Sequence, residues 1–216
     1  MSWFIQTVTS SLGKKYIMAL TGLLLGGFLL VHAAGNATIL LGRTDFLSYA
    51  RRLHSLGLPV TIAEITLLLL FCIHAVTGLV LFYRNHQARP SPYAVSRRAG
   101  GRTWGSATMA WTGIAILCFI VLHLTNFYFA DHRRSLADIV GGILDNPLYS
   151  ALYCAGLLAL TLHISHGFWS MFQSLGLNHP KYDGLIGTCR WILCGSIVGV
   201  FLTIVILLLI KRNYLA

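Results

Sequence analysis

Four histidines lie deep inside long apolar runs of this sequence: His32, His74, His123 and His163. An ionisable side chain is costly within a run long enough to cross a membrane, so each of them indicates a functional site. Imidazole is a common ligand of haem iron and of other metals, and it also relays protons. Four such residues, one in each of four successive runs, favour a cofactor held between helices.

Glycines recur at fixed distances from these histidines. A Thr-Gly pair begins eleven residues before His32 and again eleven residues before His123, while a single glycine follows His74 by four residues and His163 by four. The glycines at these positions are Gly22, Gly113, Gly78 and Gly167. Small residues allow close approach to a helix backbone, so a glycine near a ligand histidine leaves room for a flat macrocycle. The offsets, 91 residues from His32 to His123 and 89 from His74 to His163, predict a two-helix unit that is used twice.

The composition places the chain among membrane proteins. Of its 216 residues 56% are hydrophobic and only 10% are charged, whereas a soluble domain carries about 25% charged residues. The net charge of +10 would suit a nucleic-acid partner, but the basic residues lie in short segments between apolar runs, as the positive-inside rule places them. We therefore expect no nucleic acid. The five cysteines form no C-x-x-C motif, which argues against a cysteine zinc site and against covalent c-type haem attachment.

Five apolar runs are long enough to carry the histidines across a bilayer, because about 20 apolar residues cross a hydrocarbon core of about 30 Å. The predicted spans are about residues 16–41, 58–83, 104–130, 147–172 and 185–210, and they form one all-α domain over residues 1–216. Residues 131–146 are predicted to include a short interfacial helix, and the basic segment 84–103 is the candidate surface for docking a soluble partner. The five arginines of that segment predict a cytoplasmic N-terminus and a periplasmic C-terminus.

Depth along the alternating spans pairs the histidines. At a rise of about 1.5 Å per residue, His32 and His123 lie at an outer level, and His74 and His163 lie at an inner level. Two histidines at one depth on different helices suit the axial ligation of one b-type haem, so the sequence predicts a five-helix bundle around two non-covalent haem b groups. The alternative is four histidines that form hydrogen bonds between helices. Zinc is less well matched, because no carboxylate or thiol lies at ligand spacing from either pair.

Four stretches around these histidines resemble one family of membrane proteins. They are KKYIMALTGLLLGGFLLVHAAGN (14–36), FCIHAVTG (71–78), AWTGIAILCFIVLH (110–123) and LHISHGFWSMFQSLG (162–176). The stretches resemble the five-helix, dihaem cytochrome b that anchors succinate dehydrogenase and quinol:fumarate reductase. By this resemblance the haem ligands are His32, His74, His123 and His163. In the last stretch His163 fits and His166 does not, because the family's ligand stands four residues before a glycine.

The resemblance implies an electron path between a quinone and soluble partner subunits. The haems would carry electrons between menaquinol and an iron–sulfur subunit, which is joined to a flavoprotein subunit with the dicarboxylate site. Both soluble subunits would dock on the cytoplasmic face of a bacterial cytoplasmic membrane, and the whole complex could form a dimer. The quinone reaction would belong to the anchor itself. Thr161 stands where some dihaem fumarate reductases carry a glutamate implicated in proton movement, so the resemblance implies no proton route through that position.

Glu64 is the candidate group for exchanging protons with the quinone. It lies ten residues before His74, near the outer end of the second span, and a carboxylate can accept the protons of a quinol. The alternative is an interfacial carboxylate that pairs with Arg51 or Arg52. Two other functions stay open. One is a dihaem anchor of another oxidoreductase, such as a hydrogenase or formate dehydrogenase, and the other is a haem-free proton-coupled transporter that uses its histidines as a relay.

Overall fold

Long helices make up most of the molecule. The computed structural model describes residues 2–88, 104–131, 133–212 and 214–215, and within these ranges five helices are long and apolar enough to cross a membrane. They are α2 (Ser11–Asn36), α4 (Leu58–Gln87), α5 (Trp104–Phe127), α7 (Pro147–Ser174) and α8 (Asp183–Ile210). Even α5, with 24 residues, is about 36 Å long at about 1.5 Å per residue. The five predicted spans are therefore confirmed as helices of suitable length and composition.

Shorter elements join the long helices. The 3₁₀ segment η1 (Ala37–Leu41) continues α2, and η2 (Pro180–Tyr182) precedes α8; the short α-helices are α1 (Trp3–Thr9), α3 (Arg43–His54) and α6 (Leu136–Leu144). Helix α6 confirms the helix predicted within residues 131–146. Helix α3 was not predicted, since residues 43–57 read as a polar loop. It forms because Phe46 and Ala50, one turn apart, are both buried on one face.

Capping residues fix several helix boundaries, and some differ from the predicted ones. Helix α2 begins earlier than predicted, because the Ser10 hydroxyl accepts a hydrogen bond from the Gly13 backbone N–H at 3.0 Å. Helix α7 begins where predicted, with Asn146 as its N-cap and Pro147 in its first turn. Helix α8 begins at Asp183, two residues before the predicted span, and Arg190 lies two turns inside it.

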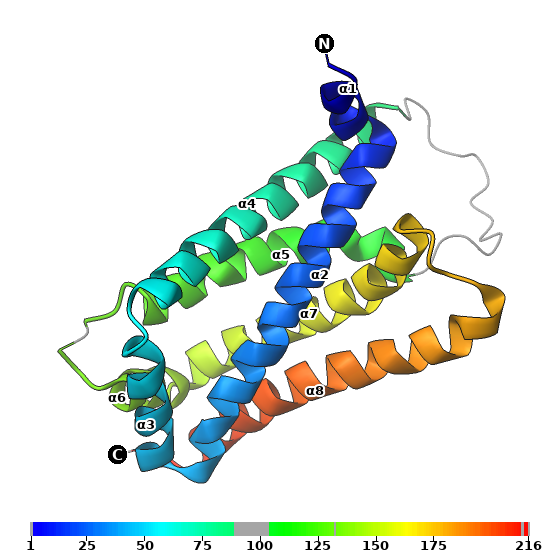
Figure 1. Cartoon of the computed structure of the whole chain (residues 1–216). Coiled ribbons are helices and arrows are strands. Elements are labelled where there is room, and N and C mark those ends of the chain that lie inside the picture. Colours follow the sequence, from blue (N-terminus) through cyan, green and yellow to red (C-terminus); the bar gives the residue numbers. More distant parts are fainter. Residues whose placement is uncertain (1, 89–103, 132, 213, 216) are drawn as a thin grey trace.

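Helices α2 and α7 lie at the centre of the bundle (Figure 1). Helix α2 packs against α4, α7 and α8, and α7 packs against α5 and α8 as well. Helix α4 is peripheral, and none of its residues is fully buried. The two ends of the chain lie at opposite ends of the bundle, with α3, α6 and the C-terminus at one end and α1 at the other. We call these the C-terminal end and the N-terminal end; which of them faces the cytoplasm stays a prediction.

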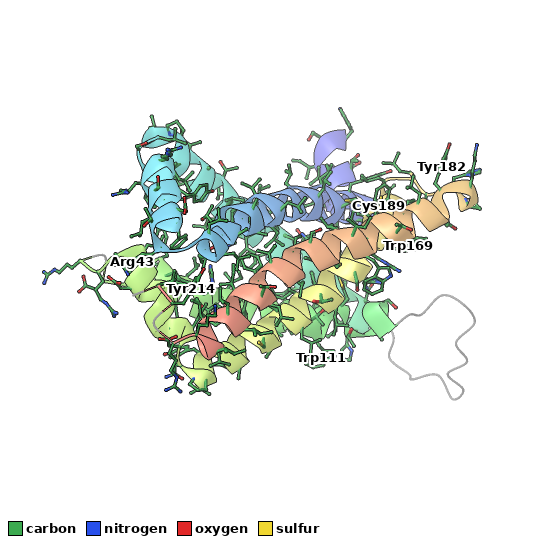
Figure 2. The ribbon with its side chains drawn as sticks, turned by 90° about the horizontal axis from the view of Figure 1, so that it is seen from below. Arg43, Trp111, Trp169, Tyr182, Cys189 and Tyr214 are labelled. Carbon is green, nitrogen blue, oxygen red and sulfur yellow. The ribbon has the colours of Figure 1, made fainter. Side chains whose placement is uncertain are left out.

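A compact core closes the C-terminal end of the bundle. Its buried side chains come from η1, α3, α6, α7, α8 and the chain end, and they are Ile39, Phe46, Ala137, Val140, Leu144, Tyr153, Ile204, Val205, Leu208 and Leu215. Arg43 ties these segments together, because its guanidinium lies 2.6 Å from the Asp138 carboxylate and donates to the Leu215 carbonyl. The Tyr214 hydroxyl donates to the Leu40 carbonyl at 3.2 Å. Figure 2 shows Arg43 and Tyr214 at the same end, opposite Trp169 and Tyr182.

Candidate functional site

The outer histidine pair comes from α2 and α5. The ring centres of His32 and His123 lie 5.9 Å apart with an interplanar angle of 83°. Phe28, one turn before His32 on α2, stacks on the His32 ring at 5.2 Å, and Phe201 of α8 lies 5.5 Å from the same ring. The pair therefore sits in an aromatic environment to which α8 also contributes.

His123 is enclosed by three aromatic rings. Phe119 and Phe127, one turn to either side on α5, lie 6.0 and 5.1 Å away, and Tyr153 of α7 lies 6.2 Å away. The Tyr153 hydroxyl accepts a hydrogen bond from the Asn126 amide at 3.3 Å. The His123 Nδ1 atom is buried and has no hydrogen-bond partner among the described residues. On the Nδ1 side the described residues therefore hold the ring by packing.

The inner histidine pair comes from α4 and α7. The ring centres of His74 and His163 lie 6.3 Å apart with an interplanar angle of 69°. Each ring has a threonine hydroxyl beside its Nδ1 atom. Thr21 Oγ1 on α2 lies 2.9 Å from His74 Nδ1, and Thr112 Oγ1 on α5 lies 3.3 Å from His163 Nδ1. The structure thus brings together the residues that the sequence paired, while their role as ligands stays a prediction.

The Thr-Gly pairs contact the inner histidines and not the outer ones from which their spacing was counted. A Cβ atom on Gly22 would lie 3.3 Å from His74 Cε1, and one on Gly113 would lie 3.4 Å from His163 Cε1. On α2, His32 follows Gly22 by ten residues, which is about 15 Å along the helix. The two histidine levels are therefore separated by about half of a ~30 Å hydrocarbon core.

The glycines that follow the inner histidines face methionines. A Cβ atom on Gly78 would lie 3.5 Å from the terminal methyl of Met18, and one on Gly167 would lie 3.5 Å from that of Met109. Met18 and Met109 are again 91 residues apart. The contacts of the unit formed by α2 and α4 are thus repeated in the unit formed by α5 and α7. A methionine side chain is flexible, so the space beside each glycine is adaptable.

Other predicted site residues lie apart from the histidine pairs. Glu64 is exposed on α4, and it makes no ion pair with Arg51 or Arg52, all three of which the structure describes. His166 packs against α5, where a Cβ atom on Gly105 would lie 2.7 Å from its own Cβ. The Thr161 hydroxyl donates to the Leu157 carbonyl one turn earlier at 2.8 Å. Most of the predicted docking segment, residues 89–103, lies outside the described residues.

Both pairs fit a metal ion with two axial imidazoles. With metal–nitrogen distances of about 2 Å on either side, two opposed imidazoles have ring centres roughly 6 Å apart. The observed separations are 5.9 and 6.3 Å. A haem supplies the other four nitrogen ligands of its iron and leaves the two axial positions for the protein. The donor type and the ring separation of each pair therefore match a haem with two histidine ligands.

Several residues around the pairs were not recognised from the sequence. The offset of 91 residues also relates Phe28 to Phe119, so applying it to every residue near His32 would have found both rings. Arg190 was not singled out either. Its guanidinium carbon lies 4.9 Å from the ring centre of Trp191 and 5.8 Å from that of Trp169, an arrangement in which aromatic faces stabilise a cation near the N-terminal end.

The geometry can serve electron transfer between two redox centres held on rigid helices. The same geometry also allows four imidazoles to pack in an apolar environment without a cofactor. The ligand bound at the site distinguishes these two uses. Comparisons with protein-family models, with curated proteins and with solved structures find no match to this chain.

Proposed function

We propose that this chain is the membrane-anchor cytochrome b subunit of a succinate dehydrogenase or quinol:fumarate reductase. Two b-type haems, one between His32 and His123 and one between His74 and His163, supply the one-electron chemistry. The chain carries electrons between menaquinol and an iron–sulfur subunit, and a flavoprotein subunit holds the dicarboxylate site. The proposal combines the residue pattern with the resemblance of the histidine-bearing stretches.

The observation that carries the proposal is the pair of adjacent imidazoles found at each of two levels. A proton relay needs histidines that follow one another along a path, whereas these histidines lie together in twos. The ring separations of 5.9 and 6.3 Å leave space for one iron between each pair. The phenylalanine rings around His32 and His123 make their environment apolar, which suits a macrocycle with apolar faces.

Two levels separated by about 15 Å along α2 and α5 make a path across about half of the hydrocarbon core. In this proposal the N-terminal end faces the cytoplasm, so the inner pair is the one nearer the iron–sulfur subunit. Menaquinol would react at the C-terminal end, where Glu64 presents an exposed carboxylate from α4. Glu64 would accept protons released as the quinol is oxidised. Lipid would surround the exposed apolar faces of α4 near this quinone site.

Haem loss in single variants tests the pairing. In a reduced-minus-oxidised spectrum of the purified protein we expect two b-type signals. His32→Ala and His123→Ala should remove the same signal, and His74→Ala and His163→Ala should remove the other one, because each haem needs both axial ligands. His54→Ala is the matched control, since His54 is exposed on α3. Absence of any b-type signal from the wild-type protein would contradict the proposal.

Co-purification tests the partners. The full chain, extracted gently from its native membrane, should bring with it a flavoprotein and an iron–sulfur protein that oxidise succinate or reduce fumarate. Recovery of a hydrogenase or formate dehydrogenase subunit in their place would overturn the assignment to the succinate and fumarate enzymes while leaving the haem sites intact.

A further inference from the structure

The two inner histidines are each held by a threonine from a neighbouring helix. Thr21 Oγ1 lies 2.9 Å from Nδ1 of His74, and Thr112 Oγ1 lies 3.3 Å from Nδ1 of His163. The two contacts join different helices, α2 to α4 and α5 to α7, yet they are equivalent under the internal repeat (Figure 1). The same contact made twice in one chain indicates a shared role.

Toward the histidine rings, the two threonine hydroxyl groups act as hydrogen-bond acceptors. The Thr21 hydroxyl donates its single proton to the Ile17 carbonyl at 2.7 Å. The Thr112 hydroxyl donates to the carbonyls of Thr108 and Met109, both at 3.1 Å. A hydroxyl whose proton is used in this way still offers oxygen lone pairs. Each threonine therefore accepts a hydrogen bond from the histidine, and the histidine carries its proton on Nδ1.

The geometry points to Thr21 and Thr112 as positioning residues that fix His74 and His163 in the Nδ1–H tautomer and so direct the unprotonated Nε2 atoms at the inner haem iron. This inference rests on the proposed function. It assigns a task to the threonines that neither the histidine spacing nor the ring separation requires. A ligand histidine usually donates its second ring N–H to a partner, which sets the ring orientation and raises the basicity of the coordinating nitrogen.

The glycine after each threonine contacts the same histidine ring as the threonine does. The Cε1 atom lies between the two ring nitrogens, and it faces Gly22 in His74 and Gly113 in His163. A methyl group at either glycine would lie 3.3–3.4 Å from that carbon, which is a tight contact. Each Thr-Gly pair thus offers an acceptor to Nδ1 and a flat backbone surface to the adjoining ring edge.

The outer histidines lack this arrangement. His123 Nδ1 has no hydrogen-bond partner among the described residues. His32 Nδ1 lies 3.5 Å from the Asn36 amide nitrogen, and that amide already donates to the His32 carbonyl at 2.9 Å. Changes to the two threonines should therefore act on the inner haem alone, which makes the outer haem an internal reference.

Removing the acceptor should change the redox potential of the inner haem. A histidine that donates from Nδ1 gives more electron density to the iron and stabilises its ferric state. Thr21→Val and Thr112→Val keep the side-chain shape but lose the oxygen, so each should shift the inner haem to a higher midpoint potential. The outer haem should keep its potential in both variants.

A redox titration of the purified full chain, followed by the haem spectrum, measures both potentials. Thr203→Val is the matched control, because the Thr203 hydroxyl makes the same kind of bond within its own helix and is exposed on α8. Thr21→Ser should restore the wild-type potential. Unchanged potentials in both valine variants would overturn the inference. Loss of the inner haem from Thr21→Val with retention in Thr21→Ser would support it, and loss from both would overturn it.

Nitrogen NMR of the full chain labelled with ¹⁵N-histidine separates this inference from the proposed function. Iron bound at Nε2 would itself keep the proton on Nδ1, so the spectrum is recorded on the full chain without haem, where it distinguishes the two neutral tautomers. Two histidines should change from the Nδ1–H to the Nε2–H tautomer in the Thr21→Val, Thr112→Val double variant. A wild-type protein without haem would overturn the proposed function, yet its tautomers would still be read. A double variant with the wild-type nitrogen spectrum would overturn the role of the threonines.

Discussion

Gly156 is the residue whose small size matters most around the outer histidine pair. A Cβ atom on Gly156 would lie 2.4 Å from Cδ2 of Phe119, far inside van der Waals contact. The Phe119 ring in turn packs against His123 and, at 5.2 Å, against Tyr153. The absence of a side chain on α7 at this position therefore lets α5 approach closely enough to enclose His123.

Gly156→Ala should destabilise the protein, because the added methyl overlaps a ring that has packed neighbours on its far side. We expect a cost of about 1–3 kcal/mol, as for other overpacked interiors. Gly199→Ala on α8 is the control, since nothing lies within 4 Å of a Cβ atom there, and alanine alone favours a helix by up to about 1 kcal/mol. Thermal unfolding in detergent measures both. Equal stability of the two variants would show that Phe119 moves freely.

Glu64→Gln should slow electron entry from menaquinol without changing either haem. The glutamine keeps the shape of the side chain but cannot take up a proton, and proton transfer by a positioned group contributes about 10²-fold or more to a rate. Stopped-flow reduction of the haems by a menaquinol analogue measures the effect, with Glu64→Asp as the variant that keeps a carboxylate. A wild-type rate in Glu64→Gln would remove Glu64 from the quinone reaction.

The sequence predicted which histidines pair but not what holds them. Pairing depends on depth, and depth follows from counting residues along alternating helices. The contact between Thr21 and His74 depends on how α2 crosses α4, which no count along one helix provides. For this reason the spacing of Thr21 and Gly22 was related to His32, which follows them on the same helix. In the structure both residues contact His74 of the inner pair.

At the scale of helices, the bundle sets the angle between the histidine planes. Each imidazole projects from a different helix, and the two members of a pair come from helices of different repeat units. The interplanar angles are 83° for His32 and His123 and 69° for His74 and His163. Neither pair is close to parallel. A haem held between the two members of a pair should therefore have the electronic structure that crossed axial ligand planes produce.

Ferric haems in these sites should give strongly anisotropic low-spin EPR signals. Crossed axial rings leave two of the iron d orbitals nearly equal in energy, whereas parallel rings split them. Low-temperature EPR of the oxidised protein measures this, and Phe201→Leu is a useful variant because Phe201 packs on the His32 ring. We expect that variant to alter only the outer signal. Two signals typical of parallel rings would contradict the observed angles.

Hydropathy predicted the long helices well and the elements at their ends less well. Helix α3 has only 12 residues and four basic or histidine side chains, so no apolar run predicts it. Its signal is the spacing of Phe46 and Ala50 between two glycines of positive φ, Gly42 and Gly57. Arg190 lies inside the predicted fifth span, where the Trp191 ring stabilises its cation within α8.

At the scale of the whole molecule, two similar helix pairs share one bundle with an added fifth span. The pair α2 and α4 repeats the contacts of α5 and α7, and α8 packs against α2 and α7. The added span is not passive, since it supplies Phe201 to the outer histidines. Its far end also reaches the core at the C-terminal end, where Leu208 is almost fully buried.

Arg43 joins parts of the chain that are far apart in sequence, and we call its contacts with Asp138 and Leu215 the Arg43 junction. The negative charge of Asp138 stabilises this junction. The Arg43 guanidinium, and after it the Ser135 hydroxyl, donate hydrogen bonds to the Asp138 carboxylate and lower the pKa of Asp138 from 3.8 to about 2. Ser135 also caps α6 through the Asp138 backbone N–H. One carboxylate thus links α3, α6 and, through Arg43, the carbonyl of Leu215.

Acid should therefore loosen the C-terminal end of the bundle over a defined range. The folded protein binds a proton on Asp138 less readily than the unfolded chain, so the junction contributes its full stability above about pH 4 and loses it as the pH falls toward 2. Thermal unfolding between pH 2 and pH 7 should show this loss in the wild type and in Asp45→Asn, which changes an exposed residue of α3. Asp138→Asn should be less stable at pH 7 and should lack the acid step, because its side chain has no charge to lose. The same acid step in Asp138→Asn as in the wild type would assign the pH dependence to other carboxylates.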